Sequence, residues 1–224
     1  MVINYLVDLN IGMNRCGVES GEPTLKLVKK LDILKGLNFL GIMAYEGHTV
    51  FIESLEERKK ETIKSLQKVS QTKQILEQAG FPCQIVSSGG TGTYMITGQY
   101  PDITEIEGGS YLTMDTKYDT IEGVSGTFKI ALSLLATVIS IPSDERVIID
   151  AGMKSITKEF GMPLLKNPME GVELYKLSEE HGFLRVSKDA KRLFSIGQKI
   201  ESFPSHGCTT INLHENMKKI PKNA

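Results

Sequence analysis

The chain has 224 residues, 26 of them Lys or Arg and 27 Asp or Glu, so its formal net charge at pH 7 is −1. This near-neutral balance gives no electrostatic reason to expect nucleic acid or an anionic membrane as a partner. No apolar run approaches the roughly 20 residues that span a bilayer, no signal peptide is recognisable, and three scattered cysteines predict free thiols in a reducing cytoplasm.

The first half of the sequence alternates segments with the patterns of strands and helices. Residues 2–7 are apolar and predict a strand, which runs into a glycine-flanked turn that presents Arg15. Pro23 opens a helical segment with one apolar face, and Gly36 is a natural stop for it. Residues 39–45 then predict a second, buried strand.

A capping box marks the start of a long charged helix. Ser54 is followed three residues later by Glu57, and Gly80 ends the segment. The inner stripe of this helix consists of Ile63, Leu66, Val69 and Leu76. Two further short strands are predicted over 83–86 and 102–106, and each runs into a glycine-rich loop.

These elements predict an α/β fold in which buried parallel strands are joined by long helical crossovers. Each strand ends in a polar or glycine-rich loop. This is the pattern of a (β/α) barrel, whose active site lies at the carboxyl ends of the strands. Only about four strand units are present, whereas a closed barrel of this type has eight. The first part of the chain is therefore expected to form half of a (β/α)8 barrel.

The pattern of residue types along the sequence changes near Thr127. Short apolar and β-branched segments follow, separated by Gly, Pro and Asn turns, which is typical of a mainly-β domain. Strands are predicted over 128–140, 146–150, 182–186 and 209–213. We therefore divide the chain into a partial barrel over 1–122 and a β domain over 123–224.

Two glycine-rich loops follow neighbouring predicted strands. The first contains Gly89, Gly90 and Thr91, and the second contains Gly109 and Ser110. Backbone N–H groups of glycine loops can converge on an anion and hydroxyl groups add donors, so the pair of loops predicts a phosphate site. The alternative interpretation is that both loops are ordinary turns.

Arg15 and Tyr45 each follow a predicted strand. At that place an arginine can serve a site, and an aromatic ring or the nearby His48 can lie against a planar ligand. The competing interpretations are a surface arginine, the commonest situation for this residue type, and a histidine that only caps the next loop.

His206 and Cys208 are the most specific pair in the second half. In an extended segment, residues two apart point to the same side, and imidazole with thiolate favours zinc over a hard cation. Two protein ligands would leave open positions, as a catalytic metal site requires. A chance occurrence of this short pattern is the competing interpretation.

In their order along the chain, these segments resemble the pyridoxal-phosphate enzymes of the D-threonine aldolase and D-serine dehydratase family. In that family an alanine-racemase-like barrel precedes a β domain. The resemblance runs through nearly the whole chain. Its segments are 7–8 with 15–17, 89–92, 107–111 with 114–115, 149–155, 180–182, and 204–208 with 212–214.

The resemblance implies that the first domain binds pyridoxal phosphate. Arg15 matches the arginine that contacts the ring hydroxyl of the cofactor, and Tyr45 lies at the strand end near the ring. The residues that match the cradle of the cofactor phosphate are Gly89, Gly90, Thr91, Gly109 and Ser110.

The same resemblance implies that the β domain carries a metal pair, His206 and Cys208, which polarises the hydroxyl of a D-3-hydroxy amino acid. A metal at that oxygen favours either loss of the hydroxyl or cleavage between Cα and Cβ, so dehydratase and aldolase activities both stay open. A cysteine ligand favours zinc, with manganese as the alternative, and slightly favours the dehydratase. A homodimer of the full-length enzyme is implied by the resemblance alone.

The sequence departs from the family at the lysine that forms the Schiff base with the cofactor. In the family this lysine lies on the first barrel strand, in an Arg-Pro-His-x-Lys-like context, and no such segment is present. Lys154 belongs to the β domain, and the lysines of the first helix should lie on the barrel exterior. The match therefore corresponds to strands five to eight plus the β domain. We expect this chain alone to be inactive, marginally stable, or both.

Two alternatives to a lyase remain open. One is a non-catalytic subunit or pseudoenzyme of the same fold, paired with another chain that supplies the lysine. The other is an alanine-racemase-like amino acid racemase. The β domain of the racemases lacks the His206 and Cys208 pair, so retention of zinc separates the racemase from the lyase.

Overall fold

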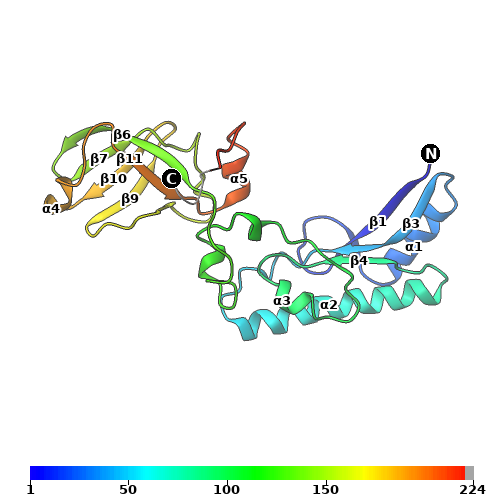
Figure 1. Cartoon of the computed structure of the whole chain (residues 1–224). Helices are drawn as coiled ribbons and strands as arrows, with labels where there is room; N and C mark the ends of the chain where they lie inside the picture. Colours follow the sequence, from blue (N-terminus) through cyan, green and yellow to red (C-terminus); the bar gives the residue numbers. More distant parts are fainter. Residues whose placement is uncertain (220–224) are drawn as a thin grey trace. The chain divides into compact units, whose positions relative to one another are not determined.

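The computed structural model describes residues 1–219 and divides into two compact units (Figure 1). The first unit comprises Met1–Tyr111 with Ile121–Ser125, and the second comprises Leu112–Thr120 with the residues from Gly126 onward. Among the described residues, no helix is long and apolar enough to cross a membrane.

The first unit is built on a five-stranded, entirely parallel sheet in the order β2-β1-β3-β4-β5. Its strands are β1 (Ile3–Asn10), β2 (Val18–Glu19), β3 (Leu37–Ala44), β4 (Ile85–Ser88) and β5 (Glu105–Ile106). Its helices are α1 (Glu22–Asp32), α2 (Leu55–Gln78) and α3 (Tyr94–Thr97), and a 3-10 turn, η1 (Ser110–Leu112), follows β5. The predicted parallel α/β architecture is confirmed.

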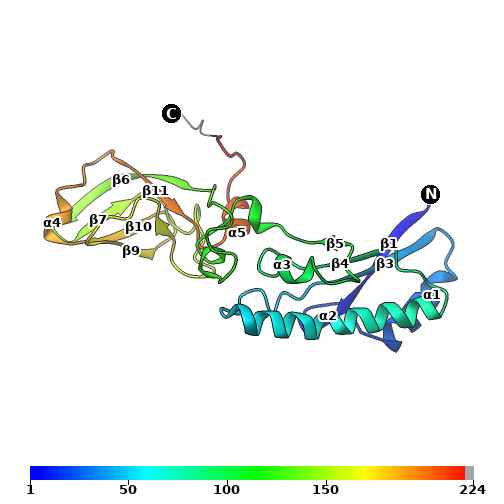
Figure 2. The same ribbon diagram turned by 60° about the horizontal axis from the view of Figure 1, so that its bottom comes forward.

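One face of this sheet is covered by helices, and α2 runs along it (Figures 1 and 2). The apolar residues that meet there include Val7, Leu9, Ile42 and Val86 from the strands and Val28, Leu66, Val69 and Leu76 from the helices. On the opposite face, Asp8, Met43, Ser87 and Glu105 lie side by side in register across β1, β3, β4 and β5. Three of these four side chains are polar.

Several local signals in the sequence fix the ends of these elements. Ser54 caps α2, because its hydroxyl accepts a hydrogen bond from the N–H of Glu57 at 3.4 Å. Strand β1 extends to Asn10, three residues beyond its predicted end. Gly41 lies where β3 and β4 approach closely: a Cβ added there would stand 1.8 Å from the carbonyl oxygen of Ile85.

Residues 121–125 belong to the first unit because of a buried arginine. Arg58 on α2 is 1% exposed, and its guanidinium donates to the carbonyl oxygens of Ile52, at 2.6 Å, and of Glu122. Backbone carbonyls thus satisfy much of a charge that would be costly to bury alone. The contact explains why the chain returns to the first unit after residue 120.

The second unit contains a six-stranded antiparallel sheet in the order β8-β11-β6-β7-β10-β9. Its strands are β6 (Leu134–Ser143), β7 (Arg146–Ile149), β8 (Leu164–Leu165), β9 (Val172–Leu177), β10 (Gly182–Val186) and β11 (Lys199–Phe203). Its helices are α4 (Lys188–Lys191) and α5 (Gly207–Ile211), with the 3-10 turn η2 (Tyr118–Thr120). The core includes Val138, Val147, Ile149 and Leu184, so a mainly-β domain is confirmed.

Two strand predictions in this unit were wrong in whole or in part. Residues 209–213 were predicted as a strand, but α5 occupies Gly207–Ile211. The β-branched run Thr209-Thr210-Ile211 favours a strand locally, and tertiary hydrogen bonds to Gly207 and Thr210 override that preference. The strand predicted over 128–140 begins only at Leu134 and continues to Ser143.

All three cysteines are free thiols, as predicted. Cys83 is buried in the core of the first unit, and this burial raises its pKa to about 11. Cys16 and Cys208 are exposed, and the thiol of Cys16 lies 3.2 Å from a carboxylate oxygen of Asp8.

Candidate functional site

The loop that carries Arg15 is organised by the last residue of β1. The side-chain oxygen of Asn10 accepts hydrogen bonds from the N–H groups of Gly12, at 3.2 Å, and Asn14, at 3.0 Å. Gly17 has a φ of +92°, and a Cβ there would stand 2.9 Å from the carbonyl oxygen of Asp8. Only glycine fits this close approach, so the loop has a defined shape that presents Arg15.

Arg15 lies next to the tyrosine that follows β3. The Arg15 guanidinium carbon is 5.7 Å from the centre of the Tyr45 ring. The same ring packs against Gly90, where an added Cβ would be 3.1 Å from a ring carbon. The structure therefore brings together Arg15, Tyr45 and Gly90 from three separate loops. Their contacts with a cofactor stay predictions.

His48 has a position that favours the structural interpretation of this residue. Its Nε2 lies 3.3 Å from the hydroxyl of Ser65 on α2, and its ring covers Gly12 of the Arg15 loop. Burial is the main cause that lowers its pKa below the usual 6.5. His48 thus links the Arg15 loop to α2.

The first glycine-rich loop uses two of its N–H groups internally. Gly89 donates to the carboxylate of Glu46 at 2.9 Å, and Gly90 donates to the Thr93 hydroxyl at 3.1 Å. Both N–H groups, which were predicted to contact a phosphate, thus donate within the protein in this structure. Their lack of side chains has a packing reason, since a Cβ would meet Thr97 at Gly89 and Tyr45 at Gly90.

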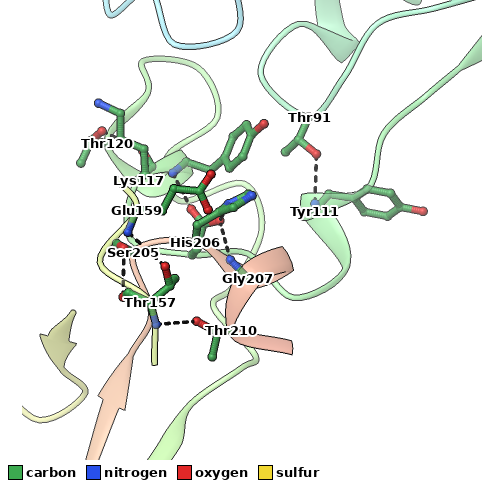
Figure 3. A network of polar contacts seen from close by, with 12 residues as sticks. Thr91, Tyr111, Lys117, Thr120, Thr157, Glu159, Ser205, His206, Gly207 and Thr210 are labelled. Atoms are coloured by element: carbon green, nitrogen blue, oxygen red, sulfur yellow. Dashed lines mark hydrogen bonds and ion pairs between the residues drawn. The ribbon is translucent and has the colours of Figure 1, made fainter. Parts of the chain in front are cut away.

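Thr91 joins the two glycine-rich loops. Its hydroxyl accepts a hydrogen bond from the N–H of Tyr111 at 3.0 Å (Figure 3). In the second loop, no atom lies within 4 Å of the place where a Cβ of Gly109 would stand, so this glycine borders open space. Gly109 is exposed and directly precedes the start of η1 at Ser110.

Replacement of Gly109 by alanine is expected to weaken binding of pyridoxal phosphate without destabilising the fold. The new methyl group meets no protein atom, so it interferes only with a ligand that approaches the backbone. Titration of the variant with pyridoxal phosphate should show an affinity lower by roughly tenfold at an unchanged melting temperature. Unchanged affinity would place the phosphate away from this loop.

Glu107 follows β5 and holds a buried, unsatisfied carboxylate oxygen. Its Oε1 has no hydrogen-bond partner among the described residues. Burial raises the pKa of this carboxyl above its ordinary 4.5, and the neighbouring charges of Glu46, Asp8 and Glu105 act in the same direction.

This raised pKa predicts a pH dependence of stability. A carboxyl that holds its proton more tightly in the folded state stabilises below about pH 4.5, and this contribution is lost as pH rises through the raised pKa. Glu107→Gln should therefore raise the melting temperature at pH 7.5 and leave it nearly unchanged at pH 4. An equal shift at both pH values would contradict this explanation.

The histidine of the predicted metal pair is oriented by a buried carboxylate. His206 immediately precedes α5, and its Nδ1 lies 3.0 Å from Oδ2 of Asp115. Asp115 is 0% exposed and also accepts hydrogen bonds from the N–H groups of Tyr118 and Gly207. An acceptor at Nδ1 favours the tautomer whose Nε2 is free to bind a metal, as at many metal sites.

The surroundings of His206 restrict its ring further. The Phe160 ring lies 4.8 Å from it, centre to centre. Thr157 bonds to residues on either side of His206. Its N–H donates to the Thr210 hydroxyl at 3.2 Å, and its carbonyl accepts from the Ser205 hydroxyl at 3.4 Å (Figure 3).

Cys208 lies exposed in the first turn of α5, so the extended geometry assumed for this pair was wrong. Within residues 1–219, no group of three or more His, Cys, Asp or Glu side chains is arranged to hold a metal ion. His206 and Cys208 remain a predicted pair of ligands, with other positions left for water or substrate.

Sequence reasoning missed three residues that shape these sites: Asn10, Glu46 and Asp115. Glu46 sits between the noticed Tyr45 and His48, and Asp115 lies in a segment quoted for the family resemblance. Both acidic residues therefore stood beside recognised motifs. Their hydrogen bonds reach partners 43 positions away for Glu46 and 91 positions away for Asp115, and such contacts cannot be predicted from spacing.

Comparisons with known proteins bear on both units. Residues 1–117 match the model of "Alanine racemase, N-terminal domain", and residues 131–219 match that of "Putative serine dehydratase domain". A D-threonine aldolase of Arthrobacter sp is 34% identical over 96% of this chain and 56% of its own length. The chain belongs to the D-threonine aldolase and D-serine dehydratase family.

Two further relatives support membership of the D-threonine aldolase and D-serine dehydratase family. The crystal structure of D-threonine aldolase from Filomicrobium marinum superimposes with a TM-score of 0.90 at 34% identity, over 96% of this chain and 57% of that one. The D-threo-3-hydroxyaspartate dehydratase of Delftia sp. (strain HT23) is 25% identical over 91% of this chain and 59% of its own. The chain thus spans little more than half the length of its curated relatives.

The first unit fits part of the cofactor implied by this family. Open space beside Gly109, the Thr91 hydroxyl and the Arg15–Tyr45 pair suit a phosphate and a planar ring. The first unit does not supply the Schiff-base lysine from a strand, because β1, β2, β3, β4 and β5 carry no lysine. The lysines of the first unit lie on α1 and α2 or, at Lys35, in the loop after α1.

Proposed function

We propose that this chain supplies the phosphate-binding half-barrel and the metal-binding domain of a lyase acting on D-3-hydroxy amino acids. The lyase uses pyridoxal phosphate and a divalent metal, zinc rather than manganese. The observation that carries the proposal is the buried Asp115, which orients His206 so that Nε2 is available. The names of the relatives, D-threonine aldolase and D-threo-3-hydroxyaspartate dehydratase, support the substrate class.

Each group of residues has a role in this proposal. When bound, the cofactor supplies the electron sink that both reactions need. Arg15 and Tyr45 orient its ring, and Thr91, Gly109 and Ser110 hold its phosphate. His206 and Cys208 hold the metal against the hydroxyl of the substrate. Cleavage between Cα and Cβ of D-threonine gives glycine and acetaldehyde, whereas loss of the hydroxyl from D-serine gives pyruvate and ammonia.

A chimera tests this proposal directly. The part of the Arthrobacter D-threonine aldolase that this chain does not cover is fused before Met1, to supply the other barrel strands and the lysine that the family resemblance implies. The expected result is release of acetaldehyde from D-threonine or pyruvate from D-serine by the zinc-loaded chimera, and neither by this chain alone. The matched control is the same chimera with His206→Ala, which should be inactive.

A non-catalytic role is the second candidate, and it is favoured by the absence of lysine from the five strands of the first unit. A chimera that binds cofactor and zinc but turns over neither amino acid would establish it. A chimera that racemises alanine without zinc would instead establish the racemase alternative. This chain turning over D-threonine or D-serine by itself would contradict the need for a lysine from elsewhere.

A further inference from the structure

The most heavily bonded buried charge in the first unit is the carboxylate of Glu46. This residue follows β3 by two positions and is 0% exposed. Its Oε2 accepts from the N–H of Gly89 at 2.9 Å, and its Oε1 accepts from the hydroxyls of Thr93 at 2.8 Å and Thr97 at 2.6 Å. The Ser88 hydroxyl lies 2.9 Å from Oε2 and 2.5 Å from the carbonyl oxygen of Ala44.

All of these donors come from one segment, residues 88–97, which contains the first glycine-rich loop. Thr93 extends this network to Gly90. Its hydroxyl donates to Glu46 and also accepts from the N–H of Gly90. Burial of a carboxylate is costly unless it is hydrogen-bonded, and charge-assisted bonds are stronger than neutral ones. The 88–97 segment therefore has one strongly preferred conformation, set by Glu46.

The same bonds determine which groups face a ligand. The N–H groups of Gly89 and Gly90 are used inside the protein. The groups left to contact a phosphate are therefore the Thr91 hydroxyl and the second glycine-rich loop. Thr91 accepts from Tyr111 and keeps its own hydrogen to donate, and Gly109 borders open space.

From these contacts we infer that Glu46 is the positioning residue of the phosphate cradle. It fixes residues 88–97 so that Thr91, Gly109 and Ser110, rather than the N–H groups of Gly89 and Gly90, meet the anion. The inference rests on the proposed function, because the anion is the phosphate of pyridoxal phosphate. Glu46 itself is fully buried and would act through the loop that it holds.

The substitution Glu46→Gln isolates this role. A glutamine has nearly the same shape, but its NH2 group must face either Gly89 and Ser88 or Thr93 and Thr97, which are donors in the native arrangement. The control is Glu61→Gln, which removes a carboxylate of α2 that pairs with Lys64 at 3.4 Å and does not bond to residues 88–97 in the described part of the chain. That change takes away a charge of the same kind outside the cradle.

The experiment compares two ligands, pyridoxal phosphate and pyridoxal, which lacks the phosphate. In Glu46→Gln the affinity for pyridoxal phosphate should fall by about tenfold or more, while that for pyridoxal stays within about twofold. Protection of the Gly89 and Gly90 amides from hydrogen exchange should fall as well. A role limited to overall stability would weaken both ligands equally and leave their affinity ratio unchanged, and this result would overturn the inference.

The failures of the two proposals are distinguishable. A wild-type chain that binds pyridoxal phosphate, combined with an unchanged affinity ratio in Glu46→Gln, overturns only the role of Glu46. A wild-type sequence that binds no pyridoxal phosphate, neither as this chain nor in the chimera, overturns both. If Glu46→Gln does not fold, Thr97→Val removes a single donor to the same carboxylate and decides the matter. It should reduce the affinity ratio by a smaller factor, and an unchanged ratio overturns the inference.

Discussion

His206→Ala should abolish metal retention by the purified chain, with the zinc content falling from about one ion per chain to nearly none. The reason is that Asp115 orients Nε2 of His206 as a ligand, and a site with two protein ligands does not survive the loss of one. Elemental analysis after dialysis against a weak chelator gives the metal content. His214→Ala is the control, because the His214 ring is 2.7 Å from the Ser155 carbonyl oxygen and is assigned no metal role.

Variants of Cys208 extend this first prediction. Cys208→Ala should also lose the metal, whereas Cys208→Asp should retain one and shift the preference from zinc toward manganese, since carboxylates suit harder cations than thiolates do. Cys16→Ala leaves a thiol in place at 208 and should keep a full complement of zinc. Zinc retained by Cys208→Ala would remove this residue from the ligand set.

Gly41→Ala is expected to prevent the first unit from folding. The added methyl would overlap the carbonyl oxygen of Ile85 on the neighbouring strand at 1.8 Å, in a sheet whose register depends on that contact. Backbone atoms of two paired strands cannot move apart without loss of the ladder, so the cost should exceed about 4 kcal/mol. Thermal unfolding followed by circular dichroism, with hydrogen exchange of β3 and β4, measures the effect.

The matched control for this prediction is Gly80→Ala. Gly80 also has a positive φ, of +89°, but no atom lies within 4 Å of its Cβ position. Its cost should be limited to the conformational strain of about 1–2 kcal/mol for a left-handed residue. Comparable losses in the two variants would mean that φ, and not the approach of Ile85, dominates at Gly41.

The parts of the fold that the sequence predicted well are those set by local chemistry. The cap at Ser54 and the alternation of apolar strands with charged helices depend on neighbouring residues, and the structure confirms them. Arg15 and Tyr45 were placed correctly at strand ends, because parallel strands bring their carboxyl ends to one edge.

The parts that escaped prediction depend on residues far apart in the chain. α5 forms although Thr209, Thr210 and Ile211 favour a strand, because Asp115 accepts from the N–H at its start and Thr157 donates to its Thr210. Glu46 likewise holds a loop that lies more than 40 positions away. No periodicity or spacing rule contains such contacts.

The contrast among the three thiols gives the protein a built-in chemical reporter. Cys83, with a pKa of about 11 and a place in the core, should resist alkylating reagents until the first unit opens. Cys16 and Cys208 are accessible from the start. Mass spectrometry after brief labelling should therefore find two modified sites in the native chain, one when zinc shields Cys208, and three after unfolding. A single measurement then reports both whether zinc is bound at Cys208 and whether the first unit is folded around Cys83.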